Sequence, residues 1–135
     1  MPRNGSSRAR HGSKALRFAR WVFRFAGLYG IVVSAPMLFF ERQIAPGITY
    51  PVFFYAWVSV VLVWQVLFLV LSTDPIRYRP MMLVSFLEKA TAVIAIPWLY
   101  ALGRIGSLWL GVAAVDLVFG VLFLAAYRET GRVPR

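Results

Sequence analysis

Between Arg42 and Asp74 the chain runs for 31 residues without a single Asp, Glu, Lys or Arg. About 20 predominantly apolar residues are enough for a helix to cross the ~30 Å hydrocarbon core of a bilayer. Further apolar stretches lie on both sides of this one, and 60% of the whole sequence is hydrophobic, against roughly 45–50% in soluble domains. The sequence therefore predicts an all-α, polytopic membrane protein whose four transmembrane helices form an antiparallel bundle.

The breaks between the apolar stretches divide the chain into a transmembrane domain and two tails. Polar segments interrupt the pattern around Pro46 and Pro75, where proline cannot continue a helix. We expect the transmembrane domain over residues 15–127, with helices at about 15–40, 50–72, 80–102 and 107–127. Residues 1–14 are rich in Gly, Ser and Arg, which predicts a disordered basic cytoplasmic tail, and residues 128–135 are a short basic cytoplasmic tail.

The first apolar stretch follows a basic segment, so a cleaved signal peptide is an alternative interpretation. The small residues Ser34 and Ala35 are followed at once by Pro36, which makes a poor cleavage site. This context favours an uncleaved first helix.

Lys and Arg residues are distributed unequally between the two ends of the predicted bundle. The end that holds both tails and the loop before residue 80 carries eleven of them, whereas the other end carries only Arg42 and Arg104. Positive residues stay on the cytoplasmic side, so both termini are predicted to be cytoplasmic. Despite the net charge of +10, this placement favours membrane lipids over nucleic acid as partners. Five basic residues are expected to contact anionic head groups: Arg8, Arg10, Lys14, Arg17 and Arg20.

The types of residue that are missing exclude several chemistries. The sequence has no cysteine, and its one histidine, His11, lies in the polar N-terminal segment. Thiol exchange, cysteine-ligated metals and a haem held by two histidines are therefore excluded within this chain. We expect no cofactor and no metal site.

Several polar side chains fall inside the predicted spanning helices, where ionisable groups are costly and face the bundle interior or water. Lys89 and Asp116 lie at similar depth on neighbouring antiparallel helices, because each helical residue advances 1.5 Å. Their opposite charges predict a buried ion pair. The candidates for a polar ligand site or a proton path are Arg24, Gln65, Glu88, Lys89 and Asp116.

Each of these residues also has a purely structural interpretation. The pair of Lys89 with Asp116 serves either to fix the helix register or to build a functional site. Arg24 either extends to the cytoplasmic head groups or pairs with Glu88, for which Gln65 is another candidate partner.

Small residues predict which helices approach each other closely. Ala26, Gly30 and Ser34 recur at a spacing of four, which places them on one face of the first helix. The helix over residues 50–72 has no such stripe, and we expect it to be the most exposed to lipid.

The chain combines the segment Asp74-Pro75-x-Arg77-x-Arg79-Pro80 with Lys89 and with Asp116-Leu117-Val118-Phe119, which is followed by Phe123. It resembles a broad set of small bacterial inner-membrane proteins with four helices, similar in architecture to DoxX-like proteins. The resemblance covers roughly residues 51–128. It implies a four-helix bundle in the bacterial inner (plasma) membrane, with Lys89 and Asp116 as characteristic polar positions, and it implies no established reaction.

Three functions follow from these features. The first is a non-enzymatic membrane protein, either an accessory subunit or a small-ligand-binding bundle, with a homo-oligomer or a larger membrane complex as its setting. The second is an oligomeric proton- or ion-coupled transporter that uses Glu88 or Asp116 as the coupling carboxylate. The third is an enzyme acting on a lipid-soluble substrate, which the sequence favours least because neither histidine nor cysteine is available beside Glu88.

Overall fold

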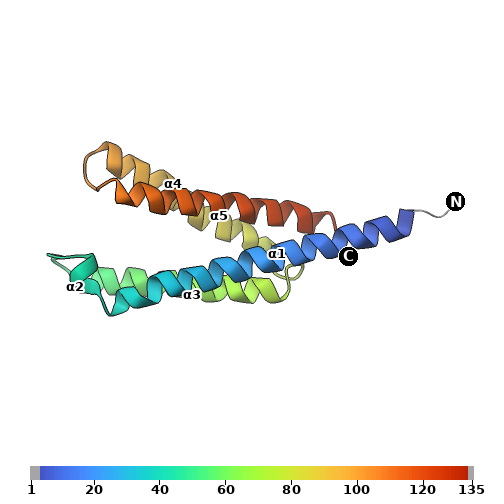
Figure 1. Cartoon of the computed structure of the whole chain (residues 1–135), viewed down its shortest axis with the longest axis horizontal. Coiled ribbons are helices and arrows are strands. Elements are labelled where there is room, and N and C mark those ends of the chain that lie inside the picture. Colours follow the sequence, from blue (N-terminus) through green and yellow to red (C-terminus); the bar gives the residue numbers. More distant parts are fainter. Residues whose placement is uncertain (1–3, 134–135) are drawn as a thin grey trace.

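The computed structural model of the chain describes residues 4–133, and its side chains from Arg10 to Val133. Its four long helices are each long and apolar enough to cross a membrane. Figure 1 shows them side by side along one axis, with both ends of the chain at the same end of the bundle. The four are α1 (Asn4–Ser34), α3 (Pro51–Thr73), α4 (Arg79–Ala101) and α5 (Leu108–Gly131).

The first helix begins much earlier than expected. α1 starts at Asn4, so residues 4–14, which we expected to be disordered, are helical. Arg10, Lys14, Ala15 and Leu16 are good helix formers, and an existing helix propagates without a new nucleation cost. The remaining residues of the two predicted tails, 1–3 and 134–135, lie outside the described residues.

The other helix boundaries follow the prolines and the turns. Pro36 has no N–H to donate, and α1 gives way to the 3₁₀ helix η1 (Ala35–Leu38), after which the short helix α2 (Glu41–Ile44) lies in the expected loop. α3 and α4 begin and end within one residue of the expected positions. α5 continues to Gly131, past the expected end at residue 127, so residues 128–131 of the predicted C-terminal tail are helical.

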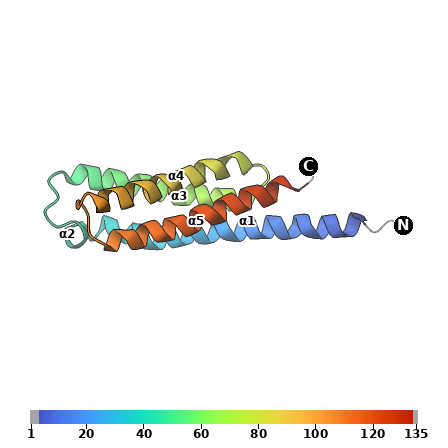
Figure 2. The same cartoon turned by 90° about the horizontal axis from the view of Figure 1, so that it is seen from above.

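The helices pack as two antiparallel hairpins. α1 packs along α3 and α4 packs along α5, while α1 also contacts α5 and thereby joins the hairpins. α3 and α4 barely touch each other. In Figure 1 the hairpins converge near the chain termini and separate toward the loops at the opposite end, and Figure 2 shows the same elements from above.

The core lies in the half of the bundle near the termini, where the hairpins meet. Phe23 of α1 stacks on Phe123 of α5 with ring centroids 4.5 Å apart, and Phe68 of α3 meets Phe123 edge-on at 5.0 Å. All three side chains are fully buried. The core cluster consists of Ala19, Val22, Phe23, Ala26, Phe68, Leu71, Met82, Phe119, Phe123 and Ala126.

Glycines on α1 let α3 approach closely. A Cβ atom added at Gly27 would lie 2.9 Å from the backbone oxygen of Gln65, and one at Gly30 would overlap the Gln65 side chain. Gly30 belongs to the predicted small-residue stripe, which therefore marks a helix contact at this position, whereas Gly27 was not part of the prediction. Because of this contact, the expectation that residues 50–72 form the most lipid-exposed helix is wrong. The buried residues of α4 are Met82, Ser85 and Lys89, and α3 has more buried residues than α4.

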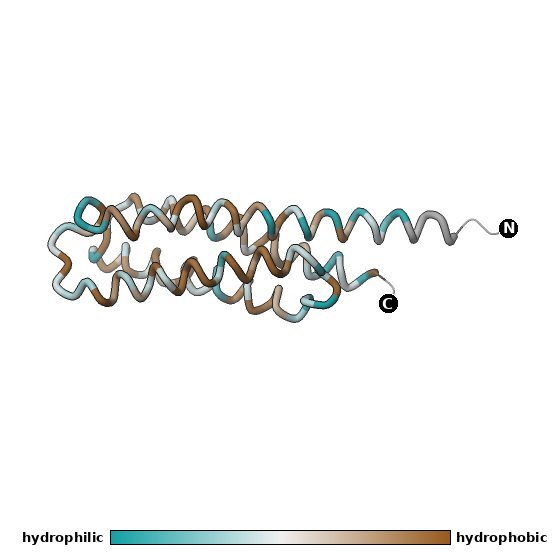
Figure 3. The backbone as a smooth tube through the Cα atoms, turned by 90° about the horizontal axis from the view of Figure 1, so that it is seen from below, coloured by the Kyte–Doolittle hydropathy of each residue, from teal (hydrophilic) through white to brown (hydrophobic). Residues whose placement is uncertain are grey.

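Hydrophobic residues follow the length of the four-helix bundle, whereas hydrophilic residues are concentrated along the N-terminal part of α1, as Figure 3 shows. The chain termini and the turn at residues 74–78 share one end of the bundle. Apart from Lys89, the basic residues of the described part of the chain therefore collect at that end, and Arg42 and Arg104 lie at the other.

Candidate functional site

The predicted ion pair between Lys89 and Asp116 is present. Lys89 of α4 faces Asp116 of α5, and its Nζ lies 2.9 Å from Asp116 Oδ1. The two side chains are only 11% and 17% exposed. The neighbouring Gly120 of α5 lies against the Lys89 side chain, since a Cβ atom there would be 3.5 Å from Lys89 Cβ. The ion pair thus spans a helix contact in which little water reaches either charge.

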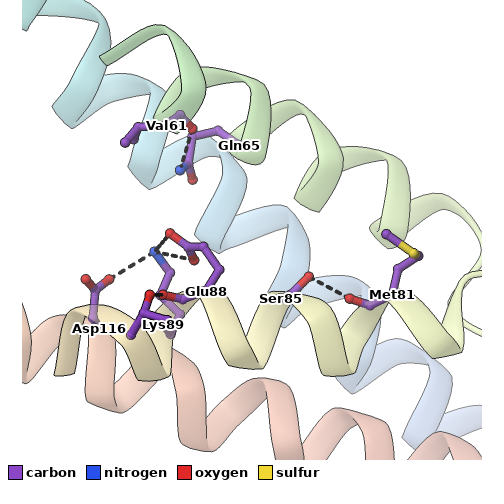
Figure 4. Close-up of polar contacts among 8 residues, drawn as sticks. Val61, Gln65, Met81, Ser85, Glu88, Lys89 and Asp116 are labelled. Atoms are coloured by element: carbon purple, nitrogen blue, oxygen red, sulfur yellow. Dashed lines mark hydrogen bonds and ion pairs between the residues drawn. The ribbon is translucent and has the colours of Figure 1, made fainter. Parts of the chain in front are cut away.

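Glu88 adds a second carboxylate to the same ammonium. Lys89 Nζ lies 3.2 Å from Glu88 Oε2 and donates a long hydrogen bond of 3.4 Å to Glu88 Oε1. Neighbouring residues on a helix do not normally face each other, so the Glu88 side chain turns back toward Lys89 (Figure 4). One cation therefore lies between two carboxylates. We call Glu88, Lys89 and Asp116 the charged triad.

One oxygen of the charged triad lacks a hydrogen bond. Glu88 Oε2 is buried and, among the described residues, it has no hydrogen-bond partner although Lys89 Nζ is close. A buried acceptor without a donor costs on the order of 1–3 kcal/mol. This oxygen is the part of the site that an additional donor or cation would satisfy.

The charged triad lies near the middle of the bundle, directly beyond the core. Lys89 is ten residues from Arg79, where α4 begins, which corresponds to about 15 Å along the helix. Phe68 of α3 covers it from the core side, with Lys89 Nζ 5.6 Å from the ring centroid. A ring face attracts a cation at this distance. The site is therefore bounded by α4, α5 and the Phe68 ring.

Gln65 belongs to a different contact. Its side chain is buried, its Nε2 donates a 3.0 Å hydrogen bond to the carbonyl of Val61 on the same helix, and its Oε1 lies against Gly30 of α1. Ser85 likewise donates within its own helix, to the Met81 carbonyl at 2.9 Å. Figure 4 shows Gln65 apart from the charged triad. The structure therefore does not support Gln65 as a partner of Glu88.

Arg24 and the basic residues before it point away from the core. Arg24 is exposed, and among the described residues it makes no ion pair with Glu88. Its exposed position agrees with the alternative, a side chain that extends toward head groups. Arg10, Lys14, Arg17 and Arg20 are exposed as well, while the side chain of Arg8 lies outside the described residues.

Sequence reasoning missed a structural role for Arg79. The Arg79 guanidinium lies 3.8 Å from the centre of the Tyr127 ring, and its Nε donates a 3.1 Å hydrogen bond to the Tyr127 carbonyl. Carbonyl groups near a helix C-terminus attract cations. The signal in the sequence was a basic residue at the start of one helix, opposite the C-terminal end of its antiparallel neighbour.

No group of three or more His, Cys, Asp or Glu side chains that could hold a metal ion occurs within residues 4–133. No protein-family model, curated protein or solved structure matches the chain. The resemblance noted above therefore retains only its coarse content of four long apolar helices. The fold and the site together define a small helical bundle of the kind that spans a membrane several times, with a buried ion pair near its middle.

Proposed function

We propose that this chain is a non-enzymatic membrane protein of the accessory or small-ligand-binding kind. It crosses a bacterial inner membrane four times with both termini in the cytoplasm, which is supported by its four apolar helices and by the unequal placement of Lys and Arg. In this proposal Lys89 and Asp116 fix the α4–α5 hairpin. Glu88 is the side chain that contacts the ligand.

The proposal depends on one observation, the buried Glu88 oxygen that accepts no hydrogen bond among the described residues. The charged triad holds two carboxylates and one ammonium, so its formal charges leave one negative charge uncompensated. Buried charge is tolerated when it is paired and fully hydrogen-bonded. The Lys89 ammonium is shared between two carboxylates, and Glu88 Oε2, although it lies 3.2 Å from Lys89 Nζ, accepts no hydrogen bond among the described residues. The matching ligand is a lipid-soluble molecule with a positive charge or a hydrogen-bond donor.

A proton- or ion-coupled transporter is the second candidate. Its support is the depth of Glu88 and Asp116, because carboxylates in the middle of spanning helices mark ion and proton pathways. Four helices enclose little aqueous space, so this function requires an oligomer. An enzyme on a lipid-soluble substrate ranks third, since the amine nearest to Glu88, that of Lys89, is held between carboxylates and is not free to act as a base.

Two lipophilic ions of the same shape and opposite charge test the ligand-binding proposal. Purified protein in neutral detergent is titrated with tetraphenylphosphonium and with tetraphenylborate, and Tm is followed, because a ligand that binds only the folded state raises it. We expect saturable stabilisation by the cation alone, and an affinity about tenfold lower for Glu88→Gln. The matched control is Glu41→Gln, which removes a carboxylate in the loop far from the charged triad.

The outcomes separate the candidates. Equal responses to both ions, or an unchanged affinity in Glu88→Gln, would contradict a cation-accepting site. Proteoliposomes containing a pH-sensitive dye test the transporter, which predicts a proton flux that Glu88→Gln or Asp116→Gln abolishes without loss of folded protein.

A further inference from the structure

Basic side chains form one continuous line along α1. Arg10, Lys14, Arg17 and Arg24 are separated by four, three and seven residues, the spacing that places side chains on one face of a helix, and Arg20 lies beside them. All five are exposed, and none of them belongs to an ion pair within the described part of the chain. We call these five residues the basic ladder.

The basic ladder faces away from the rest of the protein. The opposite face of α1 carries Ala15, Ala19 and Val22, which are buried. A Cβ atom added at Gly12, on the same side, would lie 3.4 Å from the Val133 side chain. One side of α1 is therefore covered throughout this region, at Gly12 by Val133, which follows α5, and the other side is open for a partner.

The basic ladder is too long to be covered by lipid head groups alone. Arg10 and Arg24 are fourteen residues apart, which is about 21 Å along the helix axis, or about 16 Å at the largest usual tilt. The polar layer of one leaflet is only about 5–8 Å thick, and exposed charges are screened beyond about 8 Å at physiological ionic strength. Head groups thus reach the end near Arg24, and Arg10 and Lys14 stand beyond them.

The same face of α1 becomes apolar where it enters the bundle. Trp21, within the span of the basic ladder, and Phe25 and Leu28, after it, lie on this face at helical spacing, and each is exposed. One occupant that covers the whole face must be apolar beside these residues and acidic beside Arg10 and Lys14. A nucleic acid meets the second requirement only.

A second copy of this chain does not fit. At the end of the bundle where the termini lie, its acidic residues are Asp74 and Glu129. Glu129 is paired with Arg132 at 2.6 Å, and Asp74 Oδ1 accepts the backbone N–H of Arg77 at 3.1 Å. A second copy would therefore present a surface of predominantly positive charge to the basic ladder.

With the termini on the cytoplasmic side, as proposed above, we infer that this face of α1 binds a spanning helix of a different membrane protein. That helix continues into the cytoplasm with Asp or Glu at intervals of three or four residues. Its apolar part packs on Trp21, Phe25 and Leu28, and its acidic part pairs with the basic ladder. This surface is independent of the charged triad.

A pair of synthetic membrane peptides tests this interface. Each peptide has the same Leu- and Ala-rich spanning segment, followed by a helical extension that carries either Glu or Gln at intervals of four and three residues. Association with the full-length protein is measured by energy transfer in neutral phosphatidylcholine vesicles. We expect the Glu peptide to bind, the Gln peptide to bind at least about threefold more weakly, and the difference to shrink as salt is added.

Variants of the protein locate the contact. The double variant Arg10→Gln/Lys14→Gln is expected to reduce the affinity for the Glu peptide by roughly threefold to tenfold. The matched control Arg77→Gln/Arg128→Gln removes two exposed charges from the same end of the bundle but off the basic ladder, and it should bind as the parent does. Glu88→Gln should leave this association unchanged, so a failure of the ligand-binding proposal does not affect the result.

Three outcomes would overturn the inference. Equal binding of the Glu and Gln peptides would show that the acidic extension makes no contact with the basic ladder. Two results together would assign the basic ladder to lipid. Peptide binding would be lost when anionic phosphatidylglycerol replaces part of the neutral lipid, and Arg10→Gln/Lys14→Gln would have no effect in neutral vesicles. Tighter binding of a duplex oligonucleotide than of the Glu peptide, lost in the same double variant, would assign it to nucleic acid.

Discussion

The two hairpins of this bundle are held together by different physical means. In the α1–α3 hairpin, Gly27 and Gly30 bring the backbones together, and the polar group of Gln65 is satisfied within its own helix. In the α4–α5 hairpin, opposite charges join the helices at Lys89 and Asp116, and Arg79 joins them again at the end near the termini. The first arrangement depends on shape and the second on charge, so substitutions should affect the two hairpins differently.

The largest expected effect comes from Lys89→Leu. It leaves both Glu88 and Asp116 without their cation, and removing one partner of a buried ion pair typically costs about 3–5 kcal/mol. Asp116→Leu should be milder, because Lys89 keeps Glu88 at 3.2 Å. Thermal unfolding in detergent measures both.

The same experiment separates a pair of charges from a triad. If only Lys89 and Asp116 interact, the double variant Lys89→Leu/Asp116→Leu recovers the parental stability. The triad predicts incomplete recovery, which becomes complete when Glu88→Gln is added, because the last unpaired carboxylate is then gone. Additive effects of Lys89→Leu and Asp116→Leu would contradict both.

The next largest effect should come from Gly27→Leu, in the hairpin that depends on shape. The new Cβ atom would lie 2.9 Å from the backbone oxygen of Gln65, and a backbone atom cannot move aside as a side chain can. Overpacking of this kind costs about 1–3 kcal/mol. A lower Tm is expected for the purified protein.

Gly111→Leu is the matched control for this substitution. A Cβ atom at Gly111 of α5 meets nothing within 4 Å, so the same change of residue should have little effect on Tm. Equal losses at Gly27 and Gly111 would mean that the α1–α3 contact is not the cause.

A smaller effect is expected for Arg79→Gln, which tests the second junction of the hairpin that depends on charge. The change removes the hydrogen bond to the Tyr127 carbonyl and the stacking of the guanidinium on the Tyr127 ring, together worth about 1–2 kcal/mol. Arg77→Gln removes an exposed charge two residues away and should leave Tm nearly unchanged. Fluorescence-detected unfolding compares the two variants, and equal Tm values would show that Arg79 is only a topology charge.

The sequence predicted the features that depend on hydrophobicity, and those that depend on opposite charges lying at the same depth in neighbouring helices. The helix count, most helix ends and the pairing of Lys89 with Asp116 are of this kind, because 1.5 Å per residue fixes depth without further information. The rotation of each helix about its axis was not predictable. It decides that Gln65 faces Gly30, and that Glu88 turns toward Lys89 while Arg24 remains exposed. The helical course of residues 4–14 was missed because composition was weighed above propagation from an adjoining helix.

The smallest effect is expected from the loss of a hydrogen bond on which neither hairpin depends. Tyr55 of α3 donates a 3.1 Å hydrogen bond to Glu41 of α2, at the end of the bundle where the hairpins separate, and the contact is exposed. Water replaces such a bond readily, so Tyr55→Phe should leave Tm unchanged within error. A clear loss of stability would show that α2 holds the loop end of the α1–α3 hairpin, which would then depend on a polar contact as well as on the approach of α3 to Gly27 and Gly30.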